Sequence, residues 1–351
     1  MIERIFSKDA WEKALVDLTE ACHIFVPVKE GDYHVFKPLG EENKPDFAFQ
    51  NTRLSPKSLI LPQSECMFEY SLDETSDDAH ILKEATKDFS PMAIVGIRPC
   101  DALALRLVNV NFDNPQYQDP WWVQALKATT FVGLGCNEPC ATCFCTSTGG
   151  GPFSEKGLDL LLYDLGDSFL VRSFNQPGDA FLEKLKGGET ADATAVQAAE
   201  KLPALAEEKI ASKVSTDRLR EKEVNALFEA PFWDEVAFSC INCGTCTYLC
   251  PTCWCFDIQD EVLGKEGDRL RNWDSCMFPL FTYHGSGHNP RDKKVQRVRQ
   301  RFMHKLKYYV DKYEMGVACV GCGRCVKYCP VNIDIRDVFE VMNNDAAYHR
   351  G

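Results

Sequence analysis

The stretch that decides the fold is CINCGTCTYLCPTCWC, which spans residues 240–255. A second copy of its pattern, CVGCGRCVKYCP, spans residues 319–330. Each copy contains the run C-x2-C-x2-C-x3-C-P, whose closely spaced thiolates are typical ligands of an iron–sulfur cluster. In paired runs the fourth cysteine points away from its own loop and ligates the other cluster. The two runs therefore predict two [4Fe–4S] clusters in one small unit, despite the long segment between them.

The exchange of the fourth cysteine defines two ligand sets. Gly244 and Gly323 follow the second cysteine of each run, where a residue without a Cβ lets the backbone turn tightly and approach a cluster closely. A structural zinc site is the alternative, but zinc usually takes two C-x2-C pairs, and two complete runs that end in Cys-Pro fit it poorly. The first predicted set is Cys240, Cys243, Cys246 and Cys329, and the second is Cys319, Cys322, Cys325 and Cys250.

Two further cysteines of the first copy, Cys253 and Cys255, come after the proline that completes its run. Together with Cys276 they make three thiols, one fewer than a [4Fe–4S] cluster takes from a protein. We therefore expect these three to pack as apolar sulfurs or to lie beside a cluster without ligating it.

A third group of cysteines lies in the N-terminal half of the chain. Cys100 follows the apolar run AIVGI and Cys136 follows the apolar run TFVGLG, with a helical pattern, DALALRLVNV, between them. Strand, helix and strand form the unit of a parallel sheet, whose carboxyl edge is where α/β proteins place their sites. A zinc site and buried free thiols are alternatives, because no standard run is present. The third cluster that we expect has the ligands Cys100, Cys136, Cys143 and Cys145, which leaves Cys140 over.

These patterns predict an α+β fold in three parts. Residues 1–175 are expected to form an α/β domain with a partly parallel sheet and a cysteine-rich loop edge. Residues 176–230 are rich in Ala, Glu and Lys with helical periodicity, and are expected to be a helical connector. Residues 231–351 are expected to form an α-helical ferredoxin domain with two [4Fe–4S] clusters. A long basic helix, capped by Asn289 with Pro290 in its first turn, is expected between the runs.

Composition excludes several classes of function. The net charge of the 351 residues is 39 − 52 = −13, which argues against binding to nucleic acid. The sequence has no long apolar run, so we expect no membrane span and no secretory signal. The 18 cysteines, many of them grouped at two-residue gaps, then indicate metal ligands in the cytoplasm rather than disulfides. No G-x-G-x-x-G follows a strand, so no flavin or dinucleotide is expected to bind this chain alone.

The expected helix between the runs carries a stripe of positive charge. A solvated surface is the usual explanation of such a stripe. In an acidic protein that carries anionic clusters, the stripe could instead dock a partner or raise cluster potentials. Its members are Lys293, Lys294, Arg297, Arg299, Arg301, Lys305 and Lys307.

Four segments carry a resemblance to a known family: IRPCDALAL, LGCNEPCATCFCTSTGGGP, the two cysteine runs, and WDSCMFPLFTYHGSGHNPR between the runs. From about residue 55 onward the chain resembles the iron–sulfur β subunits of NiFe sulfhydrogenases and the A subunits of anaerobic sulfite reductases. Similar chains accompany modules of the heterodisulfide-reductase type. The family also has cysteines at places that match the four ligands of the third cluster.

The resemblance implies an electron-transfer subunit of a multisubunit anaerobic oxidoreductase. Such a subunit relays electrons between a flavin- and NAD(P)H-binding subunit and a catalytic redox subunit, and none of its residues acts as acid, base or nucleophile. The alternative is a redox enzyme that reduces a disulfide or a sulfur species at the loop of residues 136–145.

Overall fold

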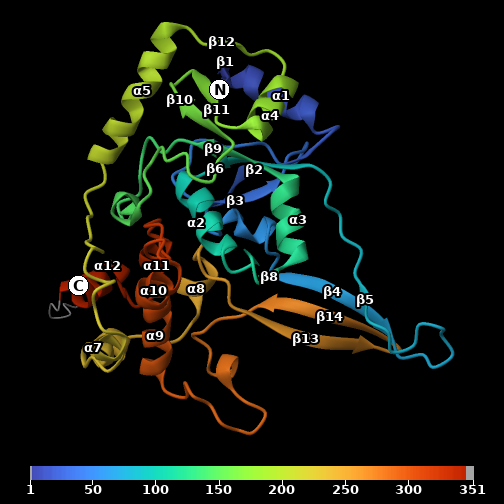
Figure 1. The fold of residues 1–351 in the computed structure, drawn as a ribbon. Helices are drawn as coiled ribbons and strands as arrows, with labels where there is room; N and C mark the ends of the chain where they lie inside the picture. Colours follow the sequence, from blue (N-terminus) through green and yellow to red (C-terminus); the bar gives the residue numbers. More distant parts are fainter. Residues whose placement is uncertain (1, 345–351) are drawn as a thin grey trace.

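The structure is a computed structural model that describes residues 2–344. An eight-stranded sheet lies above the segments that carry the cysteine runs in the view of Figure 1. Its central strands β10, β9, β6 and β2 are paired in parallel, and its outer strands are antiparallel. In order across the sheet the strands are β12 (Glu189–Thr190), β1 (Glu3–Ser7), β11 (Ser168–Ser173), β10 (Leu160–Asp164), β9 (Thr129–Leu134), β6 (Met92–Ile97), β2 (His23–Glu30) and β3 (Tyr33–Pro38).

Helices cover both faces of this sheet, because its parallel strands are apolar on both sides. In β6, Val95 packs in one core with helices α1 and α4, and Ile94 packs in another with α2, α3 and α5. The predicted α+β class with a partly parallel sheet is confirmed. The covering helices are α1 (Lys8–Leu18), α4 (Gln176–Lys184), α2 (Pro99–Asn109), α3 (Pro120–Ala128) and α5 (Ala193–Glu208).

Helix α2 carries the first cysteine of the third group. It begins at Pro99, whose missing N–H and fixed φ suit the first turn of a helix. Asp101 lies inside this first turn and is buried. Cys100 therefore projects from the amino end of a helix at the carboxyl edge of the sheet, as expected.

The segment between residues 176 and 230 is only partly helical. Helix α4 packs on the large sheet, and β12 pairs with β1, so the sheet extends past residue 175. Residues 210–223 contain no helix or strand, although their composition suggested one, and α6 (Val224–Phe228) is short. The three-part division of the chain stays a prediction. No helix within residues 2–344 combines the length and the apolar character that crossing a membrane requires.

A second sheet, which was not predicted, combines strands from the N-terminal half and the C-terminal half of the sequence. The hairpin of β13 (Phe256–Leu263) and β14 (Glu266–Trp273) lies between the cysteine runs. Strand β14 pairs antiparallel with β4 (Ser64–Ser71), which pairs with β5 (Lys83–Glu84). The sheet extends away from the body of the molecule in Figure 1.

The basic helix exists, but it starts later than predicted. Helix α9 (Lys294–Met303) continues through a π-helical turn at His304–Tyr308 into α10 (Tyr309–Tyr313). Asn289 instead stabilises a preceding turn, where its Oδ1 accepts a hydrogen bond from the Arg291 N–H at 3.0 Å. The one-residue bulge of a π turn often marks a functional position in a helix.

Candidate iron–sulfur centres

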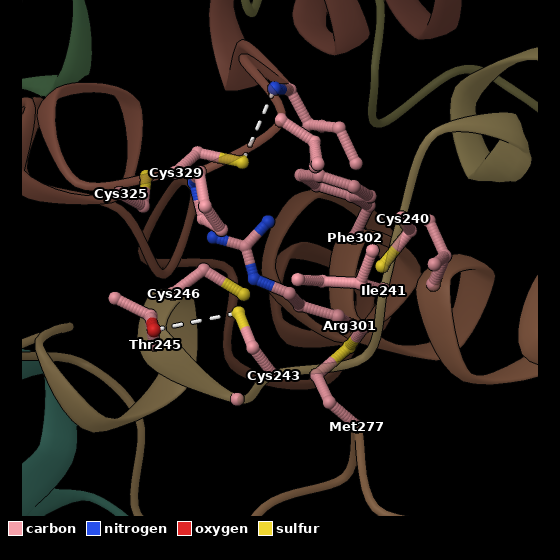
Figure 2. A pocket seen from close by; sticks show the side chains of 15 residues that line it. Cys240, Ile241, Cys243, Thr245, Cys246, Met277, Arg301, Phe302, Cys325 and Cys329 are labelled. Atoms are coloured by element: carbon pink, nitrogen blue, oxygen red, sulfur yellow. Dashed lines mark hydrogen bonds between the residues drawn. The ribbon is translucent and has the colours of Figure 1, made fainter.

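The first predicted set surrounds one cavity. Cys240 leads into the first run, and Cys243 and Cys246 flank the start of the short helix α8 (Thr245–Tyr248). Cys329 comes from the second run and has its sulfur 3.2 Å from the Ile333 N–H (Figure 2). The structure therefore brings the last cysteine of one run to the first three of the other.

The second predicted set gathers in the reciprocal way. Cys250, the last cysteine of the first run, is buried and interacts electrostatically with Cys319, Cys322 and Cys325. Burial raises the pKa of Cys322 to about 12; Arg324 opposes this rise and the charge of Cys250 adds to it. Cys325 also lines the cavity of the first set, so the two sets are neighbours.

The third set forms at the edge of the large sheet, at the end of β9 and the start of α2. Cys143 interacts with Cys100 and Cys136, and Cys145 with Cys136 and Cys322. The Cys143 sulfur also lies 3.7 Å from the backbone oxygen of Cys322. The third set is therefore next to the second.

Cys140, the cysteine left over in the sequence, lies within this third group. A hydrogen bond from the Cys143 thiol lowers the pKa of Cys140 to about 6. Five thiols thus surround a place that needs four ligands. Which four of them ligate stays a prediction.

The alternative of zinc at these sites is tested by distance. Tetrahedral zinc with bonds of about 2.3 Å places its sulfur ligands about 3.8 Å apart. Within residues 2–344, the ligand atoms of three His, Cys, Asp or Glu residues all lie within 4.8 Å of one another only at Cys66, Glu69 and Asp268. The cysteine sets are wider than that, which suits a four-iron cluster better than a single ion.

The loop that carries the third set is in close backbone contact with the second run at two glycines. Gly321 and Gly323 both have positive φ, +60° and +71°. A Cβ on Gly323 would lie 2.5 Å from the Thr142 backbone oxygen, and one on Gly321 would lie 2.5 Å from the Phe144 carbonyl carbon. The Phe144 N–H donates to the Gly321 oxygen at 2.9 Å. The glycine after the second cysteine thus permits close contact between two loops as well as a tight turn.

Four of the seven residues of the predicted basic stripe are buried, and two of these, Arg301 and Lys305, lie beside cysteines. Arg297, Arg301, Lys305 and Lys307 are each less than 8% exposed, so the expected solvated surface is wrong for them. Burial disfavours the charge of Arg301, but the thiolates of Cys246 and Cys325 outweigh burial and raise its pKa. The spacing in the sequence could have indicated a common buried face, because residues 297, 301 and 305 follow at four-residue intervals and share one side of the helix.

Arg301 also tests whether the first cavity fits an iron–sulfur cluster. Its side chain extends into the space among Cys240, Cys246 and Cys329 (Figure 2), and its Nε and Nη2 atoms are buried without a hydrogen-bond partner. Unpaired buried donors on a cation are costly. A cysteine-ligated cluster carries negative charge and sulfur acceptors, so the residues present fit it.

A buried ion pair connects the second run to the third set. Arg324, between Cys322 and Cys325, donates to both carboxylate oxygens of Asp101 at 2.6 and 2.8 Å. Both side chains are at most 2% exposed. Because Asp101 follows Cys100 directly, this pair holds the start of α2 against the second run. Nothing in the sequence marked the two residues as partners.

Two short cysteine runs, each with its fourth cysteine beside the first three of the other run, are typical of a dicluster iron–sulfur protein. In agreement, residues 239–333 match the family described as "4Fe-4S dicluster domain". The chain is also 30% identical, over 90% of its length and 91% of the relative's, to a protein named "Sulfhydrogenase 2 subunit beta" from Pyrococcus furiosus. The chain therefore belongs to the family of iron–sulfur β subunits. No solved structure matches it significantly.

Proposed function

We propose that the chain is the electron-relay subunit of an anaerobic, cytoplasmic oxidoreductase complex. It transfers electrons between a flavin- and NAD(P)H-binding subunit and a catalytic subunit of the hydrogenase, sulfite reductase or heterodisulfide reductase type. Clusters bound by the three sets supply one-electron redox centres. In this proposal the chain by itself binds no flavin or dinucleotide and catalyses no reaction of a small substrate.

The observation that carries the proposal is the continuous row of thiol sets inside one chain. Cys325 joins the first and second sets at the shared cavity. Cys322 joins the second and third sets through its contacts with Cys100 and Cys143. A row of this kind serves conduction, whereas a single catalytic site would need only one set.

The first set is the most exposed of the three. Cys243 is exposed and the other three cysteines of this set are partly exposed, whereas the second and the third set each combine two buried cysteines with two partly exposed ones. In this proposal the first set is therefore the one nearest to solvent and to a partner subunit.

The relative supports the choice of complex. That relative is named as the β subunit of a sulfhydrogenase, and the similarity extends over nearly the whole of both chains.

The test uses the full chain, reconstituted anaerobically with iron and sulfide. We expect at least about twelve irons, four for each of the three proposed clusters, paramagnetic signals of reduced clusters after dithionite treatment, and no turnover of hydrogen, sulfite or polysulfide. Turnover of any of these substrates by the isolated chain would reject the relay. Cys22→Ser, outside the three sets, is the control that should keep its iron.

The exchanged ligands have a test of their own. Cys240→Ser and Cys329→Ser should each impair the same cluster, so the double variant should lose no more iron than either single variant. Combining Cys240→Ser with Cys250→Ser should instead remove two clusters. Equal losses in both double variants would contradict the ligand sets.

A second candidate function rests on Cys140. The hydrogen bond from Cys143 lowers the pKa of Cys140 and so favours the thiolate, which is the form that attacks a disulfide or a sulfur species. Under this alternative, the loop of residues 136–145 is a reactive site. Alkylation of the cluster-loaded chain distinguishes the two functions: modification of Cys140 with loss of polysulfide reduction supports the enzyme, and an unreactive Cys140 supports the relay.

A further inference from the structure

Three cysteines outside the proposed ligand sets share a cavity of their own. Cys253, Cys255 and Cys276 line a small cavity beside the π-helical turn. The first two follow the first run, and Cys276 arrives from the segment after β14. Strand pairing between β13 and β14 brings them together, because Phe256 is paired with Trp273.

The three thiols are close neighbours. A hydrogen bond joins Cys255 and Cys276, and Cys253 interacts electrostatically with Cys276. Cys253 is also hydrogen-bonded to Cys250, the exchanged ligand of the second set. These three cysteines thus lie directly beside the second set.

Buried positive charge surrounds this group. Lys57 is 2% exposed, and its ammonium donates to the backbone oxygens of Cys250 and Cys253 and lies 4.0 Å from the centroid of the Trp273 ring. Lys305, 4% exposed, donates to the Thr252 hydroxyl and the Ala318 oxygen. Within residues 2–344, neither lysine pairs with a carboxylate at the group.

The hydrogen-bond acceptors of the two buried ammonium groups are backbone oxygens and one hydroxyl, which carry no full negative charge. A buried cation is stabilised when an anion lies beside it. A cluster held by the three thiols carries negative charge and would supply that anion next to Lys57 and Lys305.

We propose that Cys253, Cys255 and Cys276 ligate a fourth iron–sulfur cluster, with Lys57 as its buried counter-charge. His304 lines the same cavity and is the remaining side chain there with a nitrogen that can ligate iron, so it is the candidate for the fourth position. Histidine replaces cysteine in this way in some natural clusters. The three sulfurs are not all within 4.8 Å of one another, which disfavours a single zinc ion here as well.

The fourth site changes the shape of the proposed relay. The second set has neighbours on three sides: the first set at Cys325, the third at Cys322, and the fourth at Cys250. A cluster at the fourth site would make the second set a branch point instead of one stop in a line. This role rests on the proposed function, but the presence of the cluster does not.

The test counts metal in the full chain after anaerobic isolation. Cys255→Ser and Cys276→Ser should each lower the iron content by about four atoms per chain and leave the signals of the two run clusters unchanged. The matched control Cys66→Ser, on β4, should keep all its iron. Unchanged iron in both cavity variants, or the loss of one zinc instead of iron, would overturn the proposal.

A second variant keeps the test valid if loss of a ligand prevents folding. Lys57→Met leaves every proposed ligand in place and removes only the counter-charge. One cluster should then be reduced at a more negative potential, because a cation stabilises the more negative, reduced form. No shift in any potential would contradict the assigned role of Lys57. Failure of the relay itself would appear as substrate turnover by the isolated chain, which leaves these counts and potentials unaffected.

Discussion

At the scale of single residues, buried charge connects this fold to its redox sites. Arg324 and Arg301 are both nearly inaccessible to solvent, and both lie among cysteines. The two arginines differ in the groups that compensate their positive charge. Arg324 has a carboxylate partner in Asp101, whereas two nitrogens of Arg301 have no hydrogen-bond partner in the described part of the chain. One pair therefore supports the fold, and the other charge acts on the clusters.

Removal of Asp101 should be strongly destabilising. Asp101→Ala leaves the Arg324 charge buried without its carboxylate, which typically costs about 3–5 kcal/mol of the free energy of unfolding. The control is Asp78→Ala, which breaks the exposed ion pair with Lys83 and should cost under about 1 kcal/mol. Urea unfolding of the cluster-loaded proteins measures both. Similar losses in the two variants would refute the structural role of the buried pair.

Removal of Arg301 should change redox potentials. Two unit charges about 6 Å apart at an effective dielectric constant near 20 interact by roughly 3 kcal/mol, or about 100 mV for one electron. Arg301→Met should lower the midpoint potential of a neighbouring cluster by that order, because the reduced form loses a stabilising cation. Arg299→Met on the same helix is the control, since Arg299 stacks on Phe228. Redox titration followed by paramagnetic resonance measures both potentials, and equal shifts would count against this assignment.

At the scale of elements, the two runs are alike in sequence but differ in what they touch. Gly244 and Gly323 occupy equivalent positions with φ of +75° and +71°. A Cβ on Gly244 would meet the ring of Phe278 at 2.8 Å, whereas one on Gly323 would meet the backbone of Thr142. A side chain can move aside, but a backbone that holds a cysteine loop cannot do so cheaply.

The two glycines should therefore respond differently to the same substitution. Gly244→Ala and Gly323→Ala both incur about 1–2 kcal/mol from the left-handed backbone. Only Gly323→Ala should also separate the second run from the loop of residues 142–145, with a further loss of stability and of iron. Urea unfolding and visible absorbance report the two effects. A larger loss in Gly244→Ala would contradict the proposed contact.

At the scale of the whole molecule, the parts expected to be separate domains share a sheet and a buried ion pair. Arg271 on β14 is 1% exposed, and its carboxylate partners Glu65 and Asp119 both lie in the N-terminal half. The pairing of β14 with β4 spans most of both strands. The C-terminal part is thus completed by residues about 200 positions earlier, such as Glu65 opposite Arg271.

A fragment of residues 231–351 should therefore fail to fold as a cluster protein on its own. It contains every cysteine of the first two sets, but it loses the carboxylates that pair with Arg271 and Arg324. We expect an insoluble or iron-poor fragment, and recovery of iron when residues 1–230 are co-expressed. Solubility and iron content measure this. A soluble fragment that binds about eight irons would show that the ferredoxin part folds independently.

The sequence by itself determined the class of site and the central sheet. The spacing of the two runs predicted which cysteines gather, and the apolar runs before Cys100 and Cys136 predicted neighbouring parallel strands. These are local patterns, in which a few residues fix the backbone or the ligand type. The tertiary structure decided which charges are buried, why Gly323 must lack a Cβ, and that Cys253, Cys255 and Cys276 share a cavity. Those features depend on contacts between segments that are distant in the sequence. Folding alone decides which groups surround a buried charge or a thiol, and these neighbours decide its role.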